Sequence, residues 1–330
     1  MNRFLVWVAA GLLVLLAGCQ SAQVMRQGNA LATAGKAYAD AMAPLADLVL
    51  KERVDRKSKR LADERKNFTT EQLLKYPPAA YQQFIDGCLA EANLNTSAKQ
   101  RACIDGRILD AATAEMRDYQ GKLELYKQHT HKLADYFAAL NAFMNTDAGA
   151  QGQKALEESA TGLQSMGAKL ETSFQLTAGQ IAGLQSLGGL AFSEMQGSET
   201  RRLLDEHAPM IGRQLALQDA ALREFAAMLD QERKRDQLSL ENTYVRPAFQ
   251  ANTEKVPRPD LPADWVAKWT AVVTDQSAIP VLKTARSAAT SALKAWKAYV
   301  EGQSNFKDML DDLNATQSGI DALQKIYDSR

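Results

Sequence analysis

The longest helical pattern in the chain, residues 109–144, reads LDAATAEMRDYQGKLELYKQHTHKLADYFAALNAFM. Its apolar residues recur at spacings of three and four, which places them on one face of an α-helix. The positions of this face are Leu109, Ala112, Met116, Tyr119, Leu123, Tyr126, Thr130, Leu133, Phe137, Leu140 and Met144, and only Thr130 is a polar interruption. If helical throughout, the stretch is about 54 Å long, much longer than an average globular helix. Such a helix must bury its apolar face against other helices.

Three further runs have the same period. The second contains Ala289, Ala292, Trp296, Tyr299, Gln303, Phe306, Leu310, Leu313, Gln317 and Ile320. The third contains Leu204, Ile211, Leu215, Leu222, Phe225 and Leu229, and the fourth contains Leu31, Ala34, Tyr38, Leu45 and Leu48. Together the four runs predict an all-α fold, an elongated antiparallel bundle of long amphipathic helices with coiled-coil-like packing.

Turn-forming residues divide these runs. They occur at 76–78, at 147–149, at the glycines of 188–189 or 197–198, and in a proline-rich connection near 246–262. The connection holds Pro247, Pro257, Pro259 and Pro262 and is the one sizeable irregular segment that the sequence predicts. No repeat of 20 to 50 residues is evident, which argues against a helical solenoid.

The composition is that of an ordinary folded protein. Hydrophobic residues make up 46% of the 330 residues and charged residues 24%, while Lys plus Arg and Asp plus Glu both total 39. A formal net charge of zero disfavours a general nucleic-acid binder, because such proteins need an excess of positive charge.

The N-terminus has the pattern of an export signal. Arg3 precedes an uncharged apolar run, Phe4–Leu16, which is shorter than the about 20 residues that a membrane-spanning helix needs. The following residues, Leu16-Ala17-Gly18-Cys19, resemble the lipobox of bacterial lipoproteins at all four positions. The resemblance implies cleavage before Cys19 and a diacylglycerol thioether on its sulfur. It also implies acylation of the new N-terminal amine by a fatty acid such as palmitate. An ordinary secretory signal with a chance cysteine is the alternative.

Gln20 bears on the destination of such a lipoprotein. In enteric-type lipoproteins an Asp at this position resembles an inner-membrane retention signal, so Gln20 implies transfer to the outer membrane, with a periplasm-facing position as the default. The expected organisation is a signal peptide at 1–18, a lipid-anchored tether at 19–30 and the helical bundle at 31–330. The membrane is thus one expected partner, through lipidated Cys19.

Cys88 and Cys103 remain as an even pair in an oxidising compartment. They flank a turn-like stretch, residues 93–97, between two helical segments, so we expect a disulfide that clips a helix–loop–helix corner. A redox-active pair is disfavoured because the spacing is not that of a Cys-x-x-Cys motif.

Residues 172–193 carry no charge and include Gly179, Gly183, Gly188 and Gly189. Small residues four apart allow close helix–helix approach, as in transmembrane helix pairs, so a membrane-inserting hairpin is one interpretation. Three glutamines in the segment oppose insertion into hydrocarbon. A tightly packed or partner-covered helical segment is therefore favoured.

Trp265 and Trp269 lie four residues apart beside Lys268 and share one helical face. They could form an aromatic surface for a sugar or a peptide. The favoured interpretation is that they anchor the helix after the proline-rich connection to the core.

The charge-rich stretch Lys51–Lys66 also allows two readings. It could contact anionic lipid headgroups or an acidic partner. Its mixed signs favour an exposed helix with intrahelical ion pairs.

Motifs for covalent or metal chemistry are weak. His129 and His131 lie two apart and face different sides of a helix, so no zinc site is expected. Ser291-Ala-Leu-Lys294 and Ser304-Asn-Phe-Lys307 match the Ser-x-x-Lys motif without its companion Lys-Thr-Gly. We expect no cofactor, no metal and no enzymatic activity.

The functional expectation is a lipid-anchored periplasmic helical scaffold or adaptor that acts by protein binding in the cell envelope. Its partner is expected to be an envelope protein or a second copy of the chain. A membrane-active or lipid-handling protein that uses residues 172–193 is the alternative, and an envelope hydrolase is less favoured.

Overall fold

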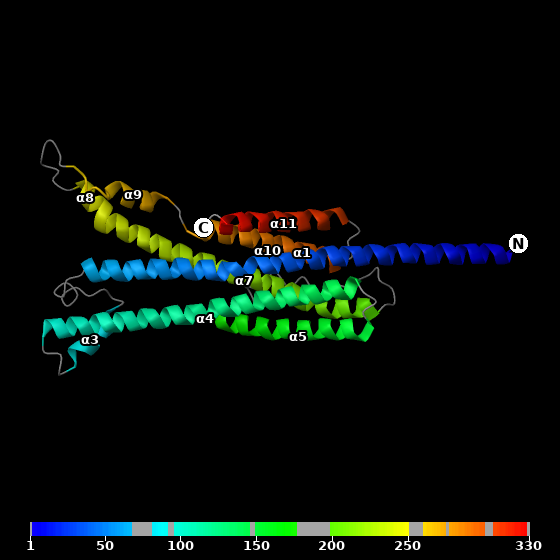
Figure 1. Ribbon diagram of the computed structural model, residues 1–330, viewed down its shortest axis with the longest axis horizontal. Coiled ribbons are helices and arrows are strands. Elements are labelled where there is room, and N and C mark those ends of the chain that lie inside the picture. The colour runs from blue at the N-terminus through cyan, green and yellow to red at the C-terminus, as the bar shows by residue number, and fades with distance from the viewer. Residues whose placement is uncertain are drawn as a thin grey trace. The chain divides into compact units, whose positions relative to one another are not determined.

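The computed structural model describes residues 2–67, 81–91, 96–145, 149–176, 199–250, 260–274, 277–300 and 306–328. Every regular element in these ranges is a helix (Figure 1). In chain order the elements are α1 (Asn2–Asn67), α3 (Gln82–Leu89), α4 (Ser97–Asn145), α5 (Gly149–Phe174), α7 (Glu199–Leu240), the π-helix η3 (Glu241–Val245), α8 (Arg246–Gln250), α9 (Trp265–Val273), α10 (Ile279–Val300) and α11 (Phe306–Asp328). The predicted all-α bundle is confirmed.

Burial along α4 follows the predicted stripe. From Ala112 to Met144 the residues of the stripe are buried, except for Met116, which is half-buried. Leu109, at the start of the stripe, is 57% exposed. The polar interruption Thr130 is fully buried and satisfies its hydroxyl by donating to the Tyr126 carbonyl at 2.8 Å. The predicted stripe of α7, Leu204 to Leu229, is buried in the same way. Helical periodicity was therefore sufficient to find these core positions.

The expectation of one helix from Ala289 to Ile320 is wrong. These residues belong to two helices, α10 and α11, that pack against each other. The packing is close, because a Cβ on Gly319 of α11 would come within 2.9 Å of the Ala288 Cβ on α10. The sequence between the ends of the two helices contains Gly302, Ser304 and Asn305, all poor helix formers.

The chain divides into two compact units, each built from separate segments. Unit 1 contains Met1–Ala46, Glu124–Ala227 and Ile279–Arg330, and unit 2 contains Asp47–Leu123 and Met228–Ala278. Helices α1, α4 and α7 contribute residues to both units. The sequence pattern predicts a single bundle over residues 31–330 and does not indicate this division.

The core of unit 1 is centred on interlocked aromatic rings. The Phe137 ring lies directly against Gly35 of α1, where a Cβ would be 2.6 Å from the ring. Phe137 also meets Trp296 of α10 edge to face, with ring centroids 6.1 Å apart. The Trp296 indole N–H donates to the Ala208 carbonyl of α7 at 3.1 Å. Four helices thus meet around two aromatic side chains, and the absence of a side chain at Gly35 is what lets α1 approach.

Residues 19–30, expected as a tether, have helical backbone and are part of α1. Within this range Asn29 donates its amide to the Asn145 side-chain oxygen of α4 at 2.6 Å. Gly28 lies against Met144 and Tyr299, so a Cβ there would be 2.7 Å from the Tyr299 hydroxyl. Packing of α1 into unit 1 therefore begins by Gly28.

Unit 2 has a buried arginine between three helices. Arg53 of α1 is 7% exposed. Its guanidinium donates to Glu115 of α4 at 2.8 Å and to Glu232 of α7 at 2.9 Å. The same group lies over the Tyr119 ring, 4.0 Å from the ring centroid. The arginine joins the three helices by charge-assisted hydrogen bonds.

The charge-rich stretch is thus only partly the exposed helix that we favoured. Arg56 does pair with Glu52 one turn away, at 2.9 Å. Arg53 and Lys57, however, pair with residues of other helices, and Lys57 lies 2.5 Å from Glu115. Interhelical partners hold this part of α1, a role that residue spacing along one helix does not reveal.

Candidate interaction surface

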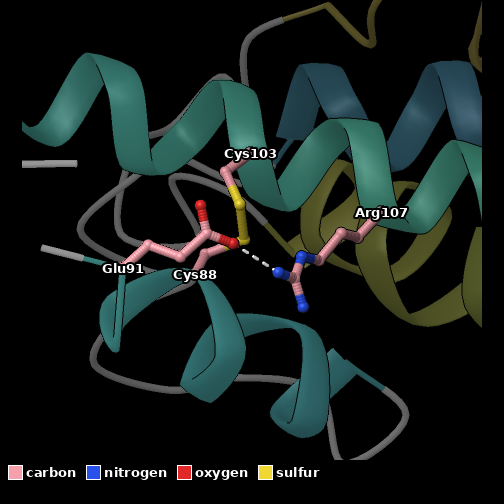
Figure 2. The surroundings of a disulfide bond; sticks show 4 residues. All are labelled: Cys88, Glu91, Cys103 and Arg107. Atoms are coloured by element: carbon pink, nitrogen blue, oxygen red, sulfur yellow. Dashed lines mark hydrogen bonds and ion pairs between the residues drawn. A yellow bond between two sulfur atoms is a disulfide. The ribbon is translucent and has the colours of Figure 1, made fainter. Parts of the chain in front are cut away.

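The predicted disulfide joins α3 to α4. Cys88 and Cys103 are bonded, with their Cα atoms 5.9 Å apart (Figure 2). Around the bond, Ile85 and Ile104 form a small buried cluster with Cys88. Beside it, Arg107 of α4 donates to the Glu91 carboxylate at 2.5 Å, as Figure 2 shows. The bond ties the eight-residue helix α3 to α4, beside a cluster of three buried residues.

Loss of this bond should loosen α3. In a Cys88→Ser, Cys103→Ser variant we expect amide exchange in α3 to rise about ten- to a hundredfold, because the loop is no longer closed covalently. Hydrogen-exchange mass spectrometry measures the change. The matched control is Arg107→Ala, which removes an exposed ion pair from the same corner and should change exchange less than about fivefold. Equal exchange in the two variants would contradict a stabilising role of the disulfide.

Several predicted site residues lie outside the described side chains. These are Cys19 and the four glycines Gly179, Gly183, Gly188 and Gly189. In the described start of the uncharged segment, Thr172–Leu176, two apolar side chains pack against α7, whereas Thr172 and Gln175 are exposed. Leu176 is buried with Leu217 and Ala220 of α7, and Phe174 meets the Phe225 ring edge to face at 5.3 Å.

Trp265 and Trp269 are positioned differently from the favoured expectation. Their rings are parallel, stacked with centroids 6.0 Å apart, and Phe249 of α8 stacks with Trp265 at 5.6 Å. The Trp265 indole N–H donates to the Val245 carbonyl of η3 at 3.0 Å. Trp265 is thus held against η3, but no residue of α9 is buried. The expectation that both tryptophans anchor α9 to the core is wrong, because Trp269 remains 47% exposed.

The two tryptophans belong to a larger apolar surface, which we call the α9 surface. It consists of Phe249, Trp265, Val266, Trp269 and Val273. Apart from half-buried Trp265, each of these side chains is at least 47% exposed. Large exposed apolar patches rimmed by polar groups are typical of binding sites.

Polar side chains border the α9 surface on one side. The Tyr244 hydroxyl is hydrogen-bonded to the Asp264 carboxylate, and this bond raises the pKa of the tyrosine. The Lys268 ammonium lies over the Tyr244 ring, 5.4 Å from its centroid. The amide of Gln237 on α7 donates to the Val272 carbonyl at 2.9 Å, which holds the end of α9 against α7.

The exposed apolar side chains are unevenly distributed between the units. The large hydrophobic residues that are exposed in the described chain are Val54, Leu89, Leu109, Leu238, Phe249, Leu261, Val266, Trp269 and Val273. All of them belong to unit 2, and the described part of unit 1 has none. Within the described residues, the exposed apolar side chains therefore lie in unit 2.

A buried polar network lies in unit 1 instead. His129 is fully buried between Gln214 and Gln218 of α7, with side-chain contacts of 2.8 Å to each. Burial lowers the pKa of His129 to about 4. His131 is exposed, so the two histidines do face different sides of α4 as predicted. Gln214 and Gln218 lie beside the apolar stripe of α7, and the spacing of that stripe does not predict that they are buried.

The weak motifs gain no support from the described side chains. Ser291 and Lys294 of the first Ser-x-x-Lys match make no hydrogen bond to each other, and Ser304 of the second lies outside the described residues. Within the described part of the chain, no group of His, Cys, Asp and Glu side chains could hold a metal ion. The described helices also contain no apolar stretch long enough to cross a membrane.

Comparison with known proteins yields no classification. No protein-family model, no curated protein and no solved structure matches this chain.

Proposed function

We propose that this protein is a lipid-anchored scaffold or adaptor of the bacterial cell envelope. Lipidated Cys19 holds it in the outer membrane, facing the periplasm, and the helical bundle binds an envelope protein. It acts by binding, without covalent chemistry. The lipobox-like Leu16–Cys19 supports the anchor, and the Cys88–Cys103 disulfide is compatible with an oxidising compartment.

One observation carries the binding role: in the part of the chain that the structure describes, the exposed large apolar side chains all lie in unit 2. Proteins that act alone seldom leave such side chains clustered in water, because each adds an unfavourable hydration cost. The densest group is the α9 surface, where aromatic rings dominate. Aromatic residues are enriched at protein interfaces, which favours a protein partner.

The membrane-active alternative rests on residues 172–193. The described start of that segment is engaged with α7 through Leu176, and this contact favours a packed segment over an inserted one. Residues 177–193 lie outside the described ranges, so their interpretation stays a prediction.

The test is quantitative crosslinking and co-purification from solubilised outer membranes. The native protein is compared with a Cys19→Ala form exported through an ordinary secretory signal, and acylation of Cys19 is followed by mass spectrometry. We expect acylated Cys19 and a stoichiometric partner that only the anchored form captures. Recovery of the chain alone, or only with itself, would exclude the adaptor role.

A further inference from the structure

Helix α5 has a glycine in the middle of its buried stripe. The buried positions recur at spacings of four and three, so they share one face of the helix. They are Leu156, Ala160, Leu163, Gly167 and Leu170. The amide of Gln214 on α7 takes the place of a side chain at Gly167, because a Cβ there would be 2.0 Å from the Gln214 oxygen. A polar group of α7 thus fills the centre of the interface with α5.

The atom that α5 covers is also the one that binds His129. The Gln214 oxygen accepts the Nε2 proton of His129 at 2.8 Å, and the Gln218 amide nitrogen donates to Nδ1 at 2.8 Å. The same nitrogen donates to the Thr130 hydroxyl oxygen at 3.0 Å. The groups that face the ring from α7, α5 and α4 are therefore uncharged, and among the described residues no carboxylate pairs with it. A proton added at Nδ1 would meet an N–H group in a site without water.

Few contacts hold α5 in place. Residues 150–174 bury four side chains, whereas α10 of the same unit buries eleven of its 22 residues. Near its end, Phe174 meets the Phe225 ring edge to face at 5.3 Å. The charged pair between α5 and α7 at this level is Glu171 with Arg213, 2.6 Å apart and partly exposed, so it contributes little. An element with few buried contacts opens at a lower free energy than the rest of its domain.

The second histidine of this interface acts in the opposite sense. His207 of α7 meets the Tyr136 ring of α4, with ring centroids 6.0 Å apart. Burial lowers the pKa of His207, while Glu206 and Glu157 of α5 act to raise it. Glu157 attracts a protonated His207, which opposes separation of α5. His129 is therefore the histidine whose protonation favours separation.

We propose that α5 is an acid-sensitive cover of unit 1, which separates from α4 and α7 when His129 takes up a proton from water at Nδ1. The rest of unit 1 stays folded. Separation uncovers Leu163 and Leu170, which are buried while α5 is in place. The described part of unit 1 then has no large exposed apolar side chain, so acid gives this unit an apolar surface. The adaptor role does not depend on this opening.

The pH range follows from the two forms of His129. In the closed form burial lowers its pKa to about 4, whereas a hydrated imidazole in the open form has the ordinary value of 6.5. Below pH 6.5 the open form takes up a proton that the closed form does not, so opening increases as the pH falls. Between pH 7 and pH 4.5 the opening equilibrium should rise about fiftyfold.

The experiment is hydrogen-exchange mass spectrometry on the full chain in detergent, at both pH values and at low urea concentrations, corrected for the intrinsic pH dependence of exchange. We expect α5 to exchange faster than α10 and with a weaker dependence on urea, because separation of one helix exposes little surface. Exchange in α5 should be about fiftyfold faster at pH 4.5. Equal opening free energies and urea dependences for α5 and α10 would overturn the inference, since α5 would then open only with the whole unit.

Two variants test His129 as the trigger. His129→Leu removes the titrating group and should reduce the difference between the two pH values to less than about threefold. Glu171→Gln breaks the ion pair with Arg213 at every pH and should keep the difference of about fiftyfold. An undiminished difference in His129→Leu, or its loss in Glu171→Gln, would assign the acid response to carboxylates and overturn the inference.

A pair of glycine substitutions in α5 tests the contact itself at pH 7. Gly167→Ala displaces Gln214 from His129 and should raise exchange in α5 about tenfold. Gly162→Ala is the matched control, because its Cβ would lie at an ordinary contact distance, 3.6 Å from the Lys132 Cδ, and should not raise exchange. Equal exchange in the two variants would show that α5 does not close the His129 network.

Discussion

Replacement of Arg53 by alanine is expected to lower the free energy of unfolding of unit 2 by about 3–5 kcal/mol, the usual cost of breaking a buried ion pair by removing one partner. The guanidinium joins α1 to Glu115 and to Glu232, and it covers the Tyr119 ring. Glu232, whose side chain is 13% exposed, would be left without its cation in a poorly hydrated position. Glu115 would keep Lys57 and lose less.

The measurement is hydrogen exchange in increasing urea, followed in peptides of α1 beyond residue 47 and of α7 beyond residue 228. Lys57→Ala is the matched control, because its ion pair with half-exposed Glu115 should contribute less than about 1 kcal/mol. An Arg53→Met, Glu232→Gln double variant should recover much of the lost stability, since neither buried charge is then left unpaired. If Arg53→Ala costs no more than Lys57→Ala, Arg53 does not hold the three helices together.

Sequence periodicity was informative where a residue's environment depends on its own helix. The stripes of α4 and α7 predicted buried positions because a 3.6-residue period fixes which side chains share a face. The disulfide was predicted because only two cysteines remained after Cys19. Both inferences used local or compositional information.

The remaining features depend on where other helices lie. The spacing of Trp265 and Trp269 showed that they share a face of α9, but not whether anything covers it. Arg53 was interpreted as part of a solvated charged helix, since its partners, Glu115 and Glu232, are distant in sequence. A polar residue beside a stripe, such as Gln218, looks the same in sequence whether it meets water or a buried histidine.

Acidification should destabilise unit 1 through His129. The Gln218 amide nitrogen, 2.8 Å away, donates to Nδ1, so the ring proton is on Nε2, which donates to the Gln214 oxygen at 2.8 Å. The same Gln218 nitrogen donates to the Thr130 hydroxyl oxygen at 3.0 Å. A second ring proton would therefore meet an N–H group. Gly167 closes the network on the α5 side, because a Cβ there would collide with the Gln214 oxygen.

The sign of the effect follows from the pKa of His129, which burial lowers from 6.5 to about 4 in the folded protein. Below pH 6.5 the unfolded chain takes up a proton that the folded chain does not, so stability falls as the pH falls towards 4. The lowered pKa corresponds to a loss of about 3 kcal/mol across this window. Burial also lowers the pKa of His207, which contributes in the same direction.

Urea unfolding at pH 7 and pH 4.5, followed by circular dichroism, measures the loss, and His129→Leu identifies its source. This variant leaves both glutamine amides without the imidazole and is expected to be less stable at pH 7, by about 1–3 kcal/mol. Its stability should nevertheless fall far less between the two pH values, because the titrating group is gone. His131→Ala is the control, since it removes an exposed imidazole from the same helix and leaves the buried network intact. His207→Gln separates the smaller contribution of the second buried histidine. An undiminished fall in the His129→Leu variant would show that carboxylates, and not the buried imidazole, set the acid sensitivity of unit 1.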